Sequence, residues 1–349
     1  MHSKKNPPVS VLMINYKDKK HTIECLERLK KQTYRGNFEV LLLDNDSQDG
    51  SHEFLAREIK KQKWPVRMKV KLHSSSANIG LSGGIEHLKK FAKHNLIAFI
   101  DNDAVPHDNW LKGMVDVIIQ HPNTPLVGCI INNVGDFYEK RAIKNDFVNL
   151  IGEPVEVKTN DPYATFKIPE GGFLFRRDII PNLYDPIYFM YGGDIYASWL
   201  ARIKGYDIKM APDSVYDHIG GLLRKKNPML EFHGEKNKVM NWILVYEKST
   251  LIKLIPVFML DIFAVLVFST LRGRGHMRLK SYWWVIKNIN LILKKRKWFQ
   301  NQRKVPDKEI LPLISSKFAY NYPILTPITN FILKWYCHIA NLPVIETKK

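Results

Sequence analysis

The first hundred residues alternate short apolar runs with segments of helical periodicity. The apolar runs are VSVLMINY, FEVLLLDN, RMKVKLHS and LIAFIDND, and the segments between them are TIECLERLKKQT, HEFLAREIKKQ and GGIEHLKKFAKHN. Runs of this length and composition are typical of buried strands, and the periodic segments are typical of amphipathic helices. The alternation predicts an α/β fold with a mostly parallel sheet that is flanked by helices on both faces. In such sheets ligands gather at the carboxyl ends of the strands.

Carboxylates stand at the ends of the two most apolar strands, at Asp44 and at Asp101. The second strand is followed by Asp101, Asn102 and Asp103, which place two carboxylates one residue apart. Asp and Asn begin turns by bonding their own backbone, so an ordinary turn explains a lone pair of this kind. The same two oxygen ligands also suit a hard divalent cation that keeps positions for water and phosphate. Evidence elsewhere in the sequence for a phosphate-bearing substrate would favour the cation site over the ordinary turn.

A glycine-rich segment, SSANIGLSGGIEH, precedes the third helical segment. Its glycines predict backbone amides that are free to lie near a diphosphate at the start of a helix. The segment lacks both the G-x-G-x-x-G pattern of dinucleotide-binding folds and the G-K-[ST] of a P-loop.

Seven segments, taken in order, resemble the family 2 glycosyltransferases of the GT-A fold, and especially their rhamnosyltransferase-like branch. They are VSVLMINYKDKKHTIECLERL, EVLLLDNDSQDGS, ANIGLSGGIEH, FIDNDAVPHDNWL, EGGFLFRRDII, YFMYGGDIYASWLARIKGYDI and YDHIGG. The resemblance runs from about Pro8 to Gly221, and a weaker one continues through LILKKRKWFQNQRKVPDKEI. It implies a GT-A fold with a Rossmann-like sheet and a nucleotide-sugar donor.

The resemblance also implies roles for individual residues. Asp44 matches the acid that reads the amide edge of the base, and Asp46 is placed as a ribose or base contact. The implied nucleotide-binding set is Asn15, Tyr16, Asp44, Asp46, Asn78, Gly80, Gly83 and Asp101.

The same resemblance implies a metal site formed by Asp101, Asp103 and His218. The first acid of the pair tends to touch the ribose and the second the metal, and the histidine completes the site. The expected ion is Mn²⁺ or Mg²⁺, which neutralises the charge that develops on a departing nucleoside diphosphate. The imidazole favours Mn²⁺ over Mg²⁺.

Asp194 is the predicted catalytic base. Transfer to a hydroxyl requires an acceptor that loses its proton, and a carboxylate on the opposite face from the leaving group serves this purpose. Relatives in the family usually carry Glu-Asp-x-Asp here, whereas this chain carries Gly193, Asp194, Ile195 and Tyr196. The departure leaves two alternatives for Asp194, which are positioning of the acceptor and capping of the following helix.

The C-terminal part is apolar and basic, and we predict a boundary between a catalytic domain, residues 1–235, and a helical membrane-associating region, residues 236–349. The chain has a formal net charge of +19. Between residues 253 and 304 the single acid Asp261 stands against these basic residues: Lys253, Arg272, Arg274, Arg278, Lys280, Lys287, Lys294, Lys295, Arg296, Lys297, Arg303 and Lys304. Such a charge indicates an anionic partner.

That partner is predicted to be a membrane surface. LIKLIPVFMLDIFAVLVFSTL is long enough to span a bilayer, but Pro256 and Asp261 lie within it and favour a helix at the interface. Trp283, Trp284 and Trp298 with the neighbouring basic residues fit an interfacial anchor. A soluble helical subdomain is the alternative. Nucleic acid is excluded as a partner because no recognised binding motif is present.

The predicted function is metal-dependent, inverting transfer of a sugar from a nucleotide-diphosphate sugar to a glycan or lipid-linked saccharide. The predicted location is the cytoplasmic side of the cell membrane, with peripheral or monotopic attachment, and the oligomeric state stays open. One alternative is a polyprenyl-phosphate glycosyltransferase, which needs no base for a hydroxyl. The other is a catalytically silent protein that keeps the fold for binding or scaffolding.

Overall fold

A mixed β-sheet forms the centre of the computed structural model, which describes residues 6–134, 142–220, 228–318 and 325–347. The strand order is β3-β2-β1-β4-β10-β6-β11-β5, and β7 pairs with β6 outside this order. The strands are β1 (Val9–Asn15), β2 (Phe38–Asp44), β3 (Met68–Ser74), β4 (Leu96–Ile100), β5 (Ala104–Pro106), β6 (Leu126–Asn133), β7 (Ala142–Ile143), β10 (Gly172–Arg176) and β11 (Ile208–His218). The predicted α/β fold is confirmed, and the four strands predicted first lie side by side and parallel.

The second half of the sheet departs from the parallel pattern. β10 runs antiparallel to both β4 and β6, and β5 runs antiparallel to β11. β10 thus separates the parallel strand β4 from the parallel pair β6 and β11.

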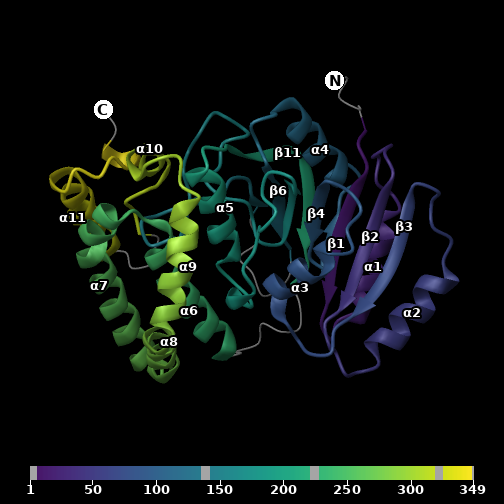
Figure 1. Cartoon of the computed structure of the whole chain (residues 1–349), viewed down its shortest axis with the longest axis horizontal. Coiled ribbons are helices and arrows are strands. Elements are labelled where there is room, and N and C mark those ends of the chain that lie inside the picture. Colours follow the sequence, from purple (N-terminus) through teal and green to yellow (C-terminus); the bar gives the residue numbers. More distant parts are fainter. Residues whose placement is uncertain (1–5, 135–141, 221–227, 319–324, 348–349) are drawn as a thin grey trace.

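Helices cover both faces of the sheet (Figure 1). One face packs against α1 (Lys19–Leu29), α2 (Ser51–Lys61) and α4 (Trp110–Gln120), and the other against α3 (Gly80–Lys89) and α5 (Gly193–Ile203). Strand β2 is buried along its whole length, as expected of a strand that is covered on both faces. The register pairs Asn15 with Asp44, so the polar strand ends meet at one edge.

The polar stretch before Thr165 contains short antiparallel strands. β7 pairs with β6, and β8 (Phe147–Val148) pairs with β9 (Pro154–Val155). The described part of this stretch therefore forms an insert that reaches the cavity described below, through Ile143, Asp146 and Pro154.

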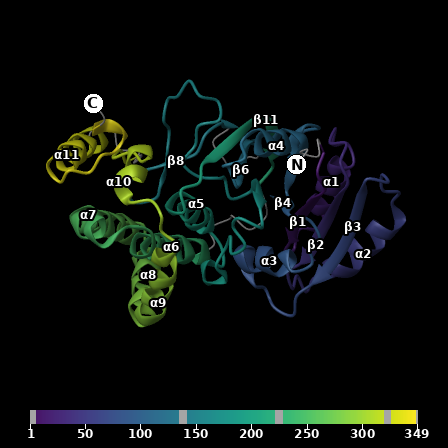
Figure 2. The same cartoon turned by 45° about the horizontal axis from the view of Figure 1, so that its top comes forward.

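The C-terminal helices gather at the end of the molecule that is opposite to β3 and α2 (Figures 1 and 2). They are α6 (Pro228–Val245), α7 (Lys248–Leu271), α8 (Gly275–Lys287), α9 (Ile289–Asn301), α10 (Asp307–Ile310) and α11 (Leu325–Ile339). Short 3-10 turns lie among them at Leu311–Leu313 and Ile345–Thr347, and another lies before α5 at Pro186–Tyr188. One apolar core includes Leu12 of β1 and Ile85 of α3 together with Met240 of α6 and Phe299 of α9. Lys236, the predicted start of the second region, lies inside α6, and the division of the chain stays a prediction.

Helix α7 is the one helix among the described residues that is long and apolar enough to cross a membrane, judged by length and composition. Its Asp261 is buried and forms an ion pair with Lys238 of α6 at 2.6 Å. The carboxylate therefore faces the protein. Large apolar side chains are exposed on the same group of helices, at Ile252, Ile255, Met259, Leu260, Phe263, Val267 and Leu271 of α7, at Trp283 and Ile286 of α8, and at Ile328, Phe331, Ile332, Trp335 and Ile339 of α11.

Candidate active site

A cavity of about 750 Å³ opens where the carboxyl ends of β1, β4 and β11 meet. Several of the predicted site residues line it, and they come from segments far apart in the sequence. These are Tyr16, Asn78, Gly80, Asp101, Asp103, Asp194 and His218. Its volume lies within the range of small-ligand and cofactor sites, about 300–1,000 Å³.

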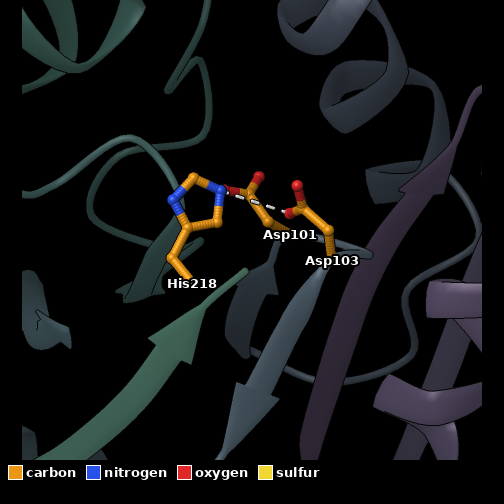
Figure 3. Close-up of side chains that lie close together, drawn as sticks. All are labelled: Asp101, Asp103 and His218. Atoms are coloured by element: carbon orange, nitrogen blue, oxygen red, sulfur yellow. Dashed lines mark ion pairs between the residues drawn. The ribbon is translucent and has the colours of Figure 1, made fainter. Parts of the chain in front are cut away.

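Asp101, Asp103 and His218 form a cluster at this edge (Figure 3). One ligand atom from each lies within 4.8 Å of the others, and His218 Nε2 is 3.3 Å from Asp103 Oδ1. The sheet register explains the contact, because β11 pairs with β5 so that His218 stands opposite Ala104. The other ring nitrogen, Nδ1, is 3.4 Å from Asn133 Oδ1.

The donor set of this cluster fits a divalent cation. Two carboxylates and one imidazole match the preferences of Mn²⁺, and three protein ligands leave positions for phosphate oxygens. Gly171 closes the wall behind Asp101, since a Cβ there would lie 2.2 Å from Asp101 Oδ2. The Asp101 amide donates a hydrogen bond to the carbonyl of Gly171 at 3.0 Å, which fixes the strand end.

Asn15 and Asp44 lie beneath the cavity, in a buried hydrogen-bond network. Asn15 Nδ2 donates to Asp44 Oδ1 at 2.7 Å, and Ser47 Oγ donates to the same oxygen at 2.5 Å. Thr22 Oγ1 donates to Asn15 Oδ1 at 2.9 Å. Nearby, Asp46 has a positive φ of 59° and accepts a hydrogen bond from the Gln48 side chain. The network orders the loop that follows β2, and direct nucleotide contact by these residues stays a prediction.

The glycine-rich segment is held by Asn45, a residue that sequence reasoning missed. Asn45 Nδ2 donates to Asn78 Oδ1 at 3.0 Å, and its Oδ1 accepts from the Ile79 amide at 3.1 Å. Asn78 Oδ1 also accepts from the Gly80 amide at 2.9 Å. The expectation of a free amide is therefore wrong for Gly80, because the side chain of Asn78 already accepts its hydrogen bond.

The glycines of this segment allow close packing. Gly80 has a φ of +69°, and a Cβ there would lie 2.3 Å from the carbonyl oxygen of Phe189. Gly83 is buried in α3, and a Cβ there would lie 3.0 Å from the Cβ of Ile79. Only glycine fits position 80, where the segment meets the wall formed by Phe189.

A second group of charges surrounds Asp194. Lys167 Nζ lies 2.6 Å from Asp194 Oδ2 and 2.5 Å from Asp146 Oδ2, and all three residues are buried. Burial opposes the charge on Lys167, but Asp146 and Asp194 outweigh it and raise the pKa of Lys167. Burial, reinforced by Asp194, raises the pKa of Glu170 well above its usual value.

Lys167, Asp146 and Glu170 were missed at the level of sequence. Glu170 opens the segment EGGFLFRRDII that carries part of the resemblance, which was the available signal. Asp146 and Lys167 are 21 residues apart, and no local pattern connects them.

Helix α5 presents Asp194 in its first turn. Gly192, in the left-handed conformation, is the N-cap, so capping does not explain Asp194. An acid at position 193 has no room, because a Cβ there would lie 2.3 Å from Tyr184 Cε1. Tyr196 packs against Tyr188 and Phe299, with ring centroids 5.4 and 5.2 Å away. Both departures from the expected motif, Gly193 and Tyr196, thus lie against aromatic side chains.

The aromatic stretch before α5 divides between core and cavity. Tyr188 is fully buried and donates to Asn241 Oδ1 at 2.5 Å, whereas Phe189 and Tyr191 line the cavity. Phe189 and Tyr191 have positive φ values of 60° and 63°. Asn237 Nδ2 donates to the carbonyls of Tyr188, Met190 and Tyr191 at 2.7–2.8 Å, which holds this strained segment in place.

Comparison with known proteins identifies the domain that carries Asp101 and Asp103. Residues 10–183 match the family described as glycosyl transferase family 2. The chain carries a family 2 glycosyltransferase domain. Among curated proteins, this glycosyltransferase is 26% identical over 248 residues to glycosyltransferase AglE of Haloferax volcanii, covering 68% of this chain and 75% of AglE.

A second relative matches a shorter part of this chain. UDP-Glc:alpha-D-GlcNAc-diphosphoundecaprenol beta-1,3-glucosyltransferase WfgD of Escherichia coli is 30% identical over 141 residues, covering 39% of this chain and 52% of WfgD. The match therefore spans about half the length of that relative.

Solved structures share the fold. Mannosyltransferase PcManGT from Pyrobaculum calidifontis, in complex with GDP-Man and Mn²⁺, superposes with a TM-score of 0.53 at 17% identity and covers 85% of this chain and 84% of its own. TarS 1-349 from S. aureus, in complex with UDP, superposes with a TM-score of 0.57 at 15% identity. The match covers 95% of this chain and 88% of the TarS chain. These likenesses establish a GT-A fold.

Proposed function

We propose that this glycosyltransferase moves a sugar from a nucleotide-diphosphate sugar to a hydroxyl of a glycan or lipid-linked saccharide, with inversion at the anomeric carbon. The convergence of Asp101, Asp103 and His218 at the mouth of the 750 Å³ cavity carries the proposal. Mn²⁺ is favoured over Mg²⁺ because one ligand is an imidazole. We also propose that the chain belongs to the rhamnosyltransferase-like branch, on the order of its motifs.

A divalent cation held by these three residues would neutralise the charge that develops on the diphosphate leaving group. The rest of the cavity then serves the donor. Tyr16, Asn78 and Gly80 line it on the side of α3, where the nucleotide is proposed to bind. The solved structure of PcManGT contains GDP-Man and Mn²⁺, and that of TarS contains UDP, which supports a nucleotide-sugar donor for a chain of this fold.

Asp194 is proposed as the base that accepts the proton of the acceptor hydroxyl. Its Oδ2 is occupied by Lys167, so Oδ1 is the oxygen for the proton. Lys167 and Asp146 hold the carboxylate at the cavity wall. A buried partner at hydrogen-bond distance fixes the side-chain rotamer, which general base catalysis requires.

Asp194→Asn tests this role. We expect kcat for transfer to fall at least about 100-fold, because a positioned general base contributes about 10²–10⁴-fold to the rate. Nucleotide binding, read by thermal stabilisation, is expected to stay unchanged. Asp116→Asn, the same substitution at an exposed carboxylate of α4 outside both cavities, is the matched control, with kcat close to that of the wild type. Transfer by Asp194→Asn at the wild-type rate would contradict the assignment.

Inversion is tested by the product. NMR of the anomeric proton is expected to show the configuration opposite to that of the donor. Retention of the donor configuration would rule out direct displacement with Asp194 as base.

The proposed site of action is the cytoplasmic face of the cell membrane, with α7 to α9 and α11 at the lipid surface. The exposed apolar side chains of these helices and the basic residues between 253 and 304 support this location. The name of the WfgD relative describes an acceptor on a diphosphoundecaprenol carrier, which supports a lipid-linked acceptor. A polyprenyl phosphate acceptor is the rival, and it predicts little effect of Asp194→Asn.

A further inference from the structure

A second cavity adjoins the donor cavity on the far side of Asp194. It has a volume of about 370 Å³. Both cavities are lined by Pro154, Lys167, Glu170, Tyr191 and Asp194, so these residues form the wall that the two cavities share. A group bound in the second cavity would therefore meet a donor in the first at the carboxylate of Asp194.

The outer walls of this second cavity come from helices α6 to α8 and from the turn before β9. They carry Glu153, Glu235, Lys238 and Arg278. Lys238 Nζ is 3.3 Å from Glu235 Oε2, and Arg278 Nη1 is 3.1 Å from the same oxygen. Lys238 also pairs with Asp261.

The charge balance of the lining excludes an anionic occupant. The cations Lys167, Lys238 and Arg278 each lie within ion-pair distance of carboxylates. These carboxylates are Asp146, Asp194, Glu235 and Asp261, four against three cations, whereas burial raises the pKa of Glu153 and of Glu170 and favours their neutral forms. A phosphate or uronate here would meet excess negative charge, whereas a neutral polyhydroxylated ring would not.

Hydrogen-bond acceptors and aromatic rings complete the lining. Glu170 Oε1 is buried and has no hydrogen-bond partner among the described residues. A buried oxygen without a partner is costly, and a ligand hydroxyl satisfies it. Tyr191, Trp199, Trp242 and Tyr246 supply aromatic surface for the C–H faces of a sugar.

Helix α7 connects this cavity to the apolar surface. Val265 lines the cavity and is itself partly exposed, so this apolar helix forms part of the cavity's edge. An alkyl chain attached to a bound sugar would continue along α7.

We infer that the second cavity binds the neutral saccharide end of a lipid-linked acceptor, with its reactive hydroxyl at Asp194 and its lipid along α7. This inference rests on the proposed function and adds the place and the charge of the acceptor sugar. It also assigns Trp242 and Glu153, which line the second cavity and not the first, to the acceptor.

Gly234 of α6 offers a test, because it lines this cavity and a Cβ there meets no atom within 4 Å. Gly234→Phe fills the cavity with a side chain, and Gly234→Ala is the matched control that improves helix propensity without filling it. Binding of octyl β-D-glucopyranoside, octyl β-D-galactopyranoside, octyl α-D-mannopyranoside and octyl N-acetyl-β-D-glucosaminide is measured by saturation-transfer NMR below their micelle concentrations. Thermal stabilisation by nucleotide and Mn²⁺ is measured in parallel.

We expect wild type and Gly234→Ala to bind at least one of the octyl glycosides, and Gly234→Phe to bind it at least about tenfold more weakly. The nucleotide shift should be the same in all three proteins. Unchanged glycoside binding by Gly234→Phe, or no binding of the four glycosides by the wild type, overturns the inference. If the wild type binds a glycoside that Gly234→Phe does not bind, yet no nucleotide stabilises it, the saccharide site stands and the proposed function fails.

The charge of the occupant is tested by comparing ligands on the wild type, and Gly234→Phe serves only to show that a ligand binds in this cavity. Methyl β-D-glucopyranoside is expected to bind more tightly than glucose 1-phosphate, and octyl β-D-glucopyranoside more tightly than the methyl glycoside. Tighter binding of glucose 1-phosphate at this cavity, lost in Gly234→Phe, would overturn the assignment to a neutral sugar.

Discussion

At the scale of single residues, two histidines near the cavity have opposite surroundings. His218 ends β11 beside Asp103 and offers Nε2 to the cluster. His233 is buried on α6, its ring stacks on Phe189 at 4.9 Å, and its Nδ1 has no hydrogen-bond partner among the described residues. Burial, with Lys236 as the second cause, lowers the pKa of His233 to about 4. The first histidine suits a ligand, and the second suits a neutral packing residue.

The lowered pKa of His233 predicts a loss of stability in mild acid. Between pH 6.5 and about 4 the unfolded chain binds a proton at this residue and the folded chain does not, so stability falls as pH falls through this window. The loss attributable to His233 is about 2–3 kcal/mol by pH 4. We expect His233→Phe, which keeps the ring contact, to show a smaller decline in urea denaturation between pH 7 and pH 4.5. Equal declines in both proteins would contradict this.

At the scale of elements, sequence patterns predicted the parallel half of the sheet and the loops that end it. The buried run of β2 and the helical spacing of α1 are local signals, and both elements form where they were expected. The antiparallel β10 was not predicted, because its partners β4 and β6 are distant in sequence. The contact of Lys167 with Asp146 and Asp194 was not predicted for the same reason, because these residues are distant in sequence and come together only in the folded chain.

The long apolar helix α7 shows a related limit. In the sequence, Asp261 indicated that α7 does not lie within lipid, because a charged side chain in the lipid interior is costly in free energy. In the folded chain Asp261 is buried against Lys238 of α6, and the exposed side of α7 is apolar. Burial opposes the charge on Lys238, but Glu235 and Asp261 raise the pKa of Lys238.

The Lys238–Asp261 pair predicts a strong dependence of stability on both partners. Lys238→Met leaves the Asp261 carboxylate buried beside an apolar side chain, and we expect a loss of about 3–5 kcal/mol in the free energy of unfolding. The double variant Lys238→Met/Asp261→Leu is expected to recover most of it, measured by denaturant unfolding. The exposed pair Lys112–Asp116 provides a control, since Lys112→Met is expected to cost at most about 1 kcal/mol. A double variant as unstable as the single one would contradict this account.

At the scale of the whole molecule, the sheet end and the helical end have different surfaces. The C-terminal helices expose large apolar side chains and most of the basic cluster, while α1, α2 and β3 lie at the opposite end (Figure 2). Helix α11 carries an exposed apolar stripe at Ile328, Phe331, Ile332 and Trp335. Such a combination favours an anionic lipid surface.

This surface predicts binding to vesicles. We expect cosedimentation with vesicles of phosphatidylglycerol and phosphatidylcholine, and weaker cosedimentation with phosphatidylcholine alone or in high salt. Phe331→Ser/Trp335→Ser is expected to reduce the bound fraction, because each aromatic side chain contributes about 1.5–3 kcal/mol when buried in an apolar phase. Val66→Ser, at an exposed position outside these helices, serves as the control. Vesicle binding that is insensitive to the α11 substitutions would place the membrane contact elsewhere.

The central claim is that Asp101, Asp103 and His218 hold a divalent cation for a nucleotide-diphosphate sugar. The most direct measurement is thermal unfolding of wild type and Asp103→Asn with UDP, GDP, dTDP or CDP, each with Mn²⁺, Mg²⁺ or EDTA. A ligand at 100 times its Kd stabilises the folded state by about 2.7 kcal/mol, which raises the melting temperature by several degrees. We predict a rise for one nucleotide that requires the metal, is larger with Mn²⁺ than with Mg²⁺, and disappears in Asp103→Asn. No rise with any nucleotide, or an equal rise in EDTA and in the variant, would contradict the claim.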